Sequence, residues 1–117
     1  MDKQSFIWVT AECEGFHSYE KAPSEVEFLK HRHRHIFKVK VWIEIFHDDR
    51  ELEFIMFKRF VEQQIKAIFF KFDGSCEQYS DVLYKEIEDK YSKRDIKISI
   101  SEDGENGSEI TYPKPKV

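Results

Sequence analysis

The sequence predicts an α+β fold in which two helices cover one face of a four-stranded, mostly antiparallel sheet. Two N-terminal stretches resemble strands, two central stretches repeat apolar residues at helical spacing, and two more strand-like stretches follow. The order ββααββ favours packing both helices against the same sheet face. The 117 residues, of which 40% are hydrophobic, suit a single domain at residues 1–117 with a sizeable core.

The first two strands are predicted at Ser5–Ala11 and Ile36–His47. Ser5–Ala11 is rich in aromatic and β-branched residues, and Ile36–His47 alternates between an apolar and a charged face. Between them, residues 12–30 contain glycine, proline, serine and many charges. We expect a long loop there, with room for a short helix near Ser24–Leu29. A loop of this length in so small a domain is usually functional.

The second half of the chain predicts two helices followed by a hairpin. Asp48-Asp49-Arg50-Glu51 offers an N-cap to the first helix, and Ser75 with Gln78 fits a capping box at the second. The expected elements are, in order, a helix at Leu52–Phe70, a helix from Ser75 to about Tyr91, a strand at Lys93–Ser101, a turn at Asp103–Gly107, a strand at Ser108–Tyr112 and a tail at residues 113–117.

Composition argues against several classes of function. The formal charge of −4, with 36% charged residues, indicates a well-solvated surface, so nucleic acid is not an expected partner. We find no signal peptide and no apolar run of membrane-spanning length, so we expect a cytoplasmic protein without a membrane partner. Cys13 and Cys76 are too few for a disulfide framework and are expected to stay reduced.

The sheet face away from the helices is expected to stay partly polar. Its polar residues would be Lys38, Lys40, Glu44, Lys97 and Ser99. A small sheet with one charged face and two open edges is suited to closing into a barrel by oligomerisation. We therefore expect a homo-oligomer.

The run His31-Arg32-His33-Arg34-His35 leads into the second strand. Imidazole is the commonest metal ligand, and side chains two apart share a strand face, so His33 and His35 could hold one ion. The outer two histidines of the run are about 13 Å apart at strand rise, so all three cannot easily share it. His17 in the long loop would complete a zinc site with three protein ligands and one open position, and Glu12 is the alternative third ligand.

The same run has a second interpretation as a basic patch. Arg32 and Arg34, with Lys38 and Lys40 on the same strand face, could hold the phosphates of a nucleotide, and no metal would be needed. An RNA- or protein-contacting surface is a third interpretation, but aromatic residues are not interleaved on that face before Trp42. Spacing alone leaves the metal and phosphate interpretations open.

Two carboxylates are candidate ligand contacts. Glu102 stands where an apolar strand face ends at a turn, and it is either a solvated turn residue or a paired acceptor for the N–H/NH2 edge of a heterocycle. Glu77 lies in the first turn of the second helix, where it could simply stabilise the helix dipole. Cys76 beside it is at a helix N-terminus, which lowers a thiol pKa, although a structural role is favoured.

Four segments carry a family resemblance, in order along most of the chain. They are His33-Arg34-His35-Ile36-Phe37, Glu53-Phe54-Ile55-Met56-Phe57-Lys58, Gly74-Ser75-Cys76-Glu77 and Glu102-Asp103. They resemble, respectively, the His-Gly-His-x-Tyr, Asp-Phe-x-x-Leu-Lys, Pro-Thr-x-Glu and Glu-Thr motifs of the 6-pyruvoyl tetrahydropterin synthase and 6-carboxytetrahydropterin synthase superfamily.

The resemblance implies the T-fold, a ββααββ domain that pairs sheets into oligomeric barrels. It also implies Zn²⁺ held by His33 and His35, with His17 in place of the family's first zinc histidine, and a pterin- or purine-related ligand anchored by Glu102, with Glu77 at the matching second-helix position. The activity implied is that of a zinc-dependent lyase on dihydroneopterin triphosphate, in a tetrahydropterin or 7-deazapurine (queuosine) pathway.

The chain departs from the family at its proton-transfer groups. Leu29-Lys30-His31-Arg32 stands where the family has its catalytic cysteine, and Phe70-Lys71-Phe72-Asp73 replaces the segment with a catalytic histidine. Glu12 occupies the place of the first zinc histidine. His31 is then the candidate for proton transfer. We therefore expect either a divergent lyase or a binding protein, and the alternative is a catalytically inactive nucleotide-binding module that uses Arg32 and Arg34.

Overall fold

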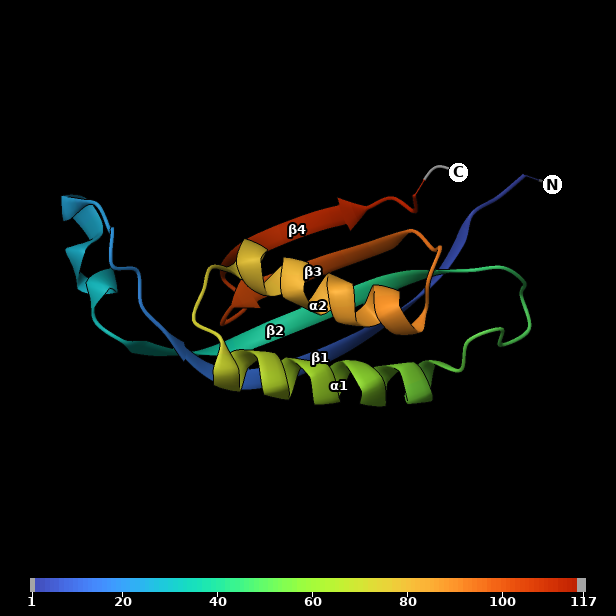
Figure 1. Ribbon diagram of the computed structural model, residues 1–117, viewed down its shortest axis with the longest axis horizontal. Coiled ribbons are helices and arrows are strands. Elements are labelled where there is room, and N and C mark those ends of the chain that lie inside the picture. The colour runs from blue at the N-terminus through green and yellow to red at the C-terminus, as the bar shows by residue number, and fades with distance from the viewer. Residues whose placement is uncertain (1, 116–117) are drawn as a thin grey trace.

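A computed structural model describes residues 2–115 and confirms an α+β architecture (Figure 1). All four strands form one antiparallel sheet in the order β1-β2-β3-β4. The elements are, in chain order, β1 (Ser5–His17), the 3₁₀ helix η1 (Ser24–Lys30), β2 (His33–Ile45), α1 (Phe54–Lys71), α2 (Cys76–Lys90), β3 (Ile96–Glu102) and β4 (Asn106–Tyr112).

Both α-helices lie on the same sheet face, as predicted (Figure 1). Helix α1 packs against β1, and α2 packs against β3 and β4. The alternation predicted for β2 holds from Phe37 to Ile43, whose core-facing side chains are fully buried. Burying each large apolar side chain contributes roughly 1.5–3 kcal/mol, so this layer between sheet and helices is the main source of stability.

The β1–β2 hairpin is longer than predicted. Strand β1 continues past Ala11 to His17, and β2 begins at His33 instead of Ile36, so the connection is residues 18–32 and not 12–30. Gly15 was read as a loop signal, but a Cβ there would lie 2.8 Å from a ring carbon of Phe37. The glycine is needed for close packing inside a strand.

Residues 18–32, which we call the arm, project beyond the sheet at one end (Figure 1). They contain η1 where a short helix was expected, and none of the η1 residues is buried. The arm therefore gains little stability from packing of its own helix.

The ends of the later elements differ from prediction by up to three residues. Helix α1 begins at Phe54 because the Glu53 carboxylate accepts hydrogen bonds from the two amides at positions 55 and 56, so the N-cap expected at Asp48–Glu51 was wrong. The capping box of Ser75 and Gln78 is confirmed. Strand β3 starts at Ile96 instead of Lys93, which has a φ of 63° and cannot continue a strand.

Buried Glu44 ties both ends of the described chain to β2. Its carboxylate accepts hydrogen bonds from the Gln4 amide (3.1 Å), the Asp95 backbone N–H (3.0 Å) and the Lys114 ammonium (3.1 and 3.2 Å). Burial acts to raise the pKa of Glu44, but these donors and the Lys114 charge outweigh it and hold the pKa below the usual value. The folded state therefore favours the ionised carboxylate.

This contact predicts a loss of stability in acid. A carboxylate with a lowered folded-state pKa stabilises the fold above its unfolded pKa, about 4.3 for Glu, and this stabilisation disappears as the pH falls through the folded value. We expect Glu44→Gln to be less stable than wild type at pH 7 and to lose less stability on acidification. Urea denaturation at a series of pH values tests this, with exposed Glu86→Gln as control. If the free energy of unfolding depends on pH in the same way in wild type and Glu44→Gln, this prediction is contradicted.

The other sheet face carries a stacked aromatic and basic patch. Strand pairing sets Trp8 directly opposite Trp42. The Lys40 ammonium lies 4.2 Å from the Trp8 ring centroid and 4.6 Å from that of Trp42, and Lys97 lies 4.5 Å from Trp42. The face is thus partly polar, as expected, but Trp8 adds an aromatic residue that was missed when the second strand was considered alone.

No helix within residues 2–115 is long and apolar enough to span a membrane.

Candidate metal centre

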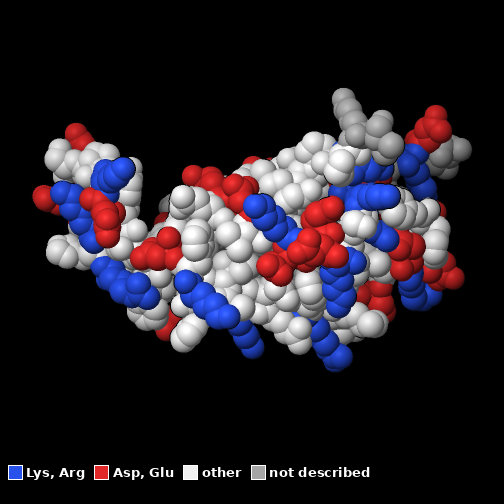
Figure 2. All heavy atoms as spheres, in the orientation of Figure 1, with Lys and Arg blue, Asp and Glu red and all other residues white. Residues whose placement is uncertain are grey.

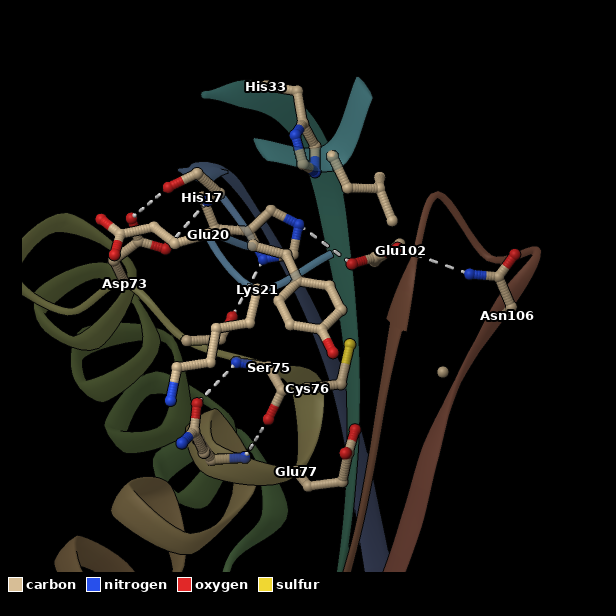
Figure 3. Close-up of a pocket in the computed structure, with 16 residues that line it drawn as sticks. His17, Glu20, Lys21, His33, Asp73, Ser75, Cys76, Glu77, Glu102 and Asn106 are labelled. Carbon is tan, nitrogen blue, oxygen red and sulfur yellow. Dashed lines mark hydrogen bonds and ion pairs between the residues drawn. The ribbon is translucent and has the colours of Figure 1, made fainter. Parts of the chain in front are cut away.

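Three strands bring polar side chains to one end of the core. His17 ends β1, His33 and His35 open β2, and Glu102 ends β3. All four side chains lie on the side of the sheet that the helices cover. On β2, Phe37 is the fully buried residue nearest to the histidines. The register pairs His17 with His33, and Figure 3 shows these two with Glu102 at the mouth of a pocket.

The three histidines converge. One ring nitrogen from each of His17, His33 and His35 lies within 4.8 Å of the others, and the ring centroids are 4.6–5.1 Å apart. Glu12 lies on the other sheet face, paired across β2 with Lys38, so it does not join them. Of the two candidate third ligands, the structure brings His17 to the cluster.

Each imidazole is oriented through its Nδ1 atom. His17 Nδ1 lies 2.9 Å from the Gly74 carbonyl oxygen, His33 Nδ1 lies 2.8 Å from the His31 carbonyl oxygen, and His35 Nδ1 lies 2.7 Å from Asp103 Oδ2. Since all three partners are acceptors, each Nδ1 carries the proton and each Nε2 presents a lone pair. Metal-binding histidines are typically held in this way.

Two of these lone pairs lack a donor. His17 Nε2 and His35 Nε2 are buried and have no hydrogen-bond partner. Their nearest charged neighbour is the Glu102 carboxylate, at 3.0 Å from His17 and 3.7 Å from His35. A metal cation between the imidazoles and the carboxylate would satisfy these lone pairs and the negative charge together. The residues therefore fit a metal ion, and imidazole ligands suit zinc, copper, iron or nickel.

A cavity of about 750 Å³ adjoins the histidines, a volume typical of small-molecule sites. Its walls come from the arm, the α1–α2 linker, the first turn of α2, the end of β3 and the start of β4. In Figure 2 the arm stands apart from the body across this hollow. Glu77 and Glu102 both line the cavity, so two carboxylates face the space beside the cluster (Figure 3).

No protein-family model and no curated protein matches this chain. The assignment of the site therefore rests on its own residues.

The cavity contains a thiol that stays protonated. Burial raises the pKa of Cys76 to about 12, and the negative charges of Glu102 and Glu77 add to the effect. These outweigh the lowering expected at a helix N-terminus. Burial also raises the pKa of Cys13, whose thiol donates to the Glu14 carbonyl oxygen. Neither cysteine is poised as a thiolate at neutral pH.

The other candidate residues lie around the cluster. His31 is exposed, and its carbonyl oxygen, not its ring, contacts His33. Arg34 pairs with Glu14 at 2.8 Å, and the Arg32 guanidinium lies 3.7 Å from Asp73. Both arginines named for the phosphate interpretation therefore have carboxylate partners within the chain.

Sequence reasoning missed the residues that orient the histidines. Gly74 and Asp103 were named in the segments that carry the family resemblance, but not as acceptors for the histidines. Asp73 was named only in the segment that replaces the family's catalytic histidine, although it accepts hydrogen bonds from the Ser18 amide (3.1 Å) and hydroxyl (3.3 Å) at the base of the arm. Asp103 has a φ of 60°, a backbone conformation that Asp tolerates better than most residues. An aspartate before glycine was the only local signal.

Proposed function

We propose that this chain is a metal-binding T-fold protein that takes a pterin- or purine-related heterocycle into the cavity beside His17, His33 and His35. The ion is Zn²⁺. The observation that carries the proposal is the set of three imidazoles whose Nδ1 atoms contact acceptors and of which one ring nitrogen each lies within 4.8 Å of the others. The antiparallel ββααββ arrangement with both helices on one face supports the T-fold.

The cavity supports a heterocyclic ligand. A pterin or a 2-amino-6-oxopurine such as guanine presents adjacent N–H and NH2 groups, and one carboxylate can accept a hydrogen bond from each. Glu102 is the proposed acceptor, since it lines the cavity next to the cluster, and Glu77 faces the same space from α2.

The finer proposal is lyase activity on dihydroneopterin triphosphate. A bound zinc ion would supply Lewis-acid polarisation of a substrate oxygen. The chain's own residues would orient the heterocycle through Glu102 and Glu77. Burial raises the pKa of the Cys76 thiol, which disfavours Cys76 as the base. His31, exposed two residues before His33, is the imidazole left to move a proton.

Metal content and substrate turnover test the two levels of this proposal. Protein purified without a His tag or chelators is expected to contain about one zinc per chain, the stoichiometry of a single three-histidine site. Zinc-loaded protein is then incubated with dihydroneopterin triphosphate and the mixture analysed by mass spectrometry. Zinc below about a tenth of an equivalent would reject the metal site. Intact substrate after long incubation would reject the lyase and leave the binding proposal standing.

The heterocycle anchor has its own test. At saturating zinc, Glu102→Gln is expected to weaken heterocycle binding by about 1.5–3 kcal/mol, the value of hydrogen bonds to a charged group. Titration calorimetry measures the change, and Glu86→Gln on the exposed side of α2 is the control. Equal affinity for wild type and Glu102→Gln would remove Glu102 from the binding site.

We also propose a homo-oligomer. Among the described residues, β1 and β4 each have a neighbouring strand on one side only. Unpaired edges of this kind invite strand pairing between chains. Light scattering is expected to give a multiple of 14.1 kDa, and a monomeric mass at every concentration would contradict it.

A further inference from the structure

The Glu102 carboxylate bridges two of the three imidazoles. Oε2 lies 3.0 Å from His17 Nε2, and Oε1 lies 3.7 Å from His35 Nε2. We propose that Glu102 is the fourth protein ligand of the metal ion, so that without a heterocycle the centre is closed by three histidines and one glutamate. This inference rests on the proposed metal site and specifies how that site is regulated.

The separations fit donors that share one ion. Two ligands each about 2.05 Å from a tetrahedral zinc ion lie about 3.3 Å apart. The two observed nitrogen–oxygen distances fall on either side of that value. The pairs are not hydrogen bonds, because both nitrogens lack a partner of suitable geometry. A shared cation would satisfy the two lone pairs and the carboxylate together.

The strand positions hold Glu102 close to the cluster. As the last residue of β3, it pairs with Phe37 on one side and with Asn106 on the other. The Asn106 amide donates to Oε1 over 3.4 Å, a long contact that leaves the carboxylate able to turn. Strand pairing therefore fixes the backbone of Glu102, whereas its carboxylate is held less firmly.

Glu102 is also the ligand that can be displaced. Its side chain is 24% exposed and faces the cavity, whereas that of His17 is 10% exposed. The N–H/NH2 edge of a heterocycle would compete for the same carboxylate oxygens. Heterocycle binding and metal coordination by Glu102 are therefore mutually exclusive, and a ligand in the cavity opens a coordination position.

Cobalt(II) bound to the full chain tests the inference through its visible spectrum and its affinity. Wild type is expected to give the intense bands of a four-coordinate site. In Glu102→Gln a water would take the place of the carboxylate as fourth ligand, so the visible bands are expected to shift, and cobalt is expected to bind more than about 100-fold more weakly, beyond the 10–100-fold typical of losing an outer hydrogen bond. Asp103→Asn, which removes the outer acceptor of His35, should fall within that smaller range. Glu86→Gln on the exposed side of α2 should match wild type.

The outcomes separate the two proposals. Wild-type spectrum and affinity in Glu102→Gln would reject coordination by Glu102 and leave the three-histidine site intact. If His35→Ala binds cobalt as tightly as wild type, the metal site itself is rejected. Glu102→Asp provides a second variant, since it keeps the charge but shortens the reach. Coordination predicts an affinity below wild type for Glu102→Asp, whereas an effect of charge alone predicts an unchanged one.

Discussion

His17→Ala is expected to lower the affinity of the chain for zinc by more than about 100-fold, because it removes a ligand and not merely an outer hydrogen bond. His17 is the member of the cluster that comes from β1, and its ring lies 4.6 Å from that of His33 and 5.1 Å from that of His35. Competition against a chromogenic chelator measures the change.

His47→Ala is the matched control for this loss. His47 is exposed in the loop after β2, where its ring accepts a hydrogen bond from the Asp49 amide. The zinc affinity of His47→Ala is expected to equal that of wild type. Circular dichroism checks that His17→Ala keeps its fold, since the ring also contacts the Gly74 carbonyl. Tight zinc binding by folded His17→Ala would place the metal elsewhere.

Phe37→Ala is expected to lower the free energy of unfolding by about 3–5 kcal/mol, as large-to-small changes at filled core sites do. The ring is 0% exposed, stacks on Phe69 at 4.5 Å and meets the edge of Tyr79 at 5.4 Å. The variant would also loosen the metal centre, because Phe37 lies 5.3 Å from the His17 ring. Urea denaturation measures the loss.

Phe28→Ala is the control for this core substitution. Phe28 lies on the arm and is 68% exposed, so its removal should change stability by less than about 0.5 kcal/mol. A loss below about 1 kcal/mol in Phe37→Ala would mean that neighbouring rings close the cavity, and the packing described for this end of the core would be wrong.

Much of the fold follows from local pattern. The alternation in β2 and the helical spacing in α1 are properties of short windows, and both predicted the observed elements. The end of β1 was predicted wrongly because its last residues carry charges and Gly15, which are typical of loops. The reason for that glycine is the ring of Phe37, 22 positions away, which no local window contains.

Local sequence likewise predicted one part of the candidate site and could not predict the other. The spacing of His33 and His35 is a local signal, His17 was named from the predicted long loop and Glu102 from the end of a predicted strand, and the resemblance to a known family supported both. The acceptors that orient the rings are distant in sequence: Gly74 is 57 positions from His17, and Asp103 is 68 from His35. Only the strand register and the α1–α2 linker bring them together. The family and its activity remain proposals.

The uncovered sheet face has an optical consequence. Trp8 and Trp42 are the only tryptophans, and both indoles lie on that face with the Lys40 ammonium beside them. The histidine cluster lies on the opposite side of the sheet. Intrinsic tryptophan fluorescence should therefore respond to pairing or stacking on the open face and stay unchanged when zinc is added, so one emission signal can follow assembly independently of metal loading.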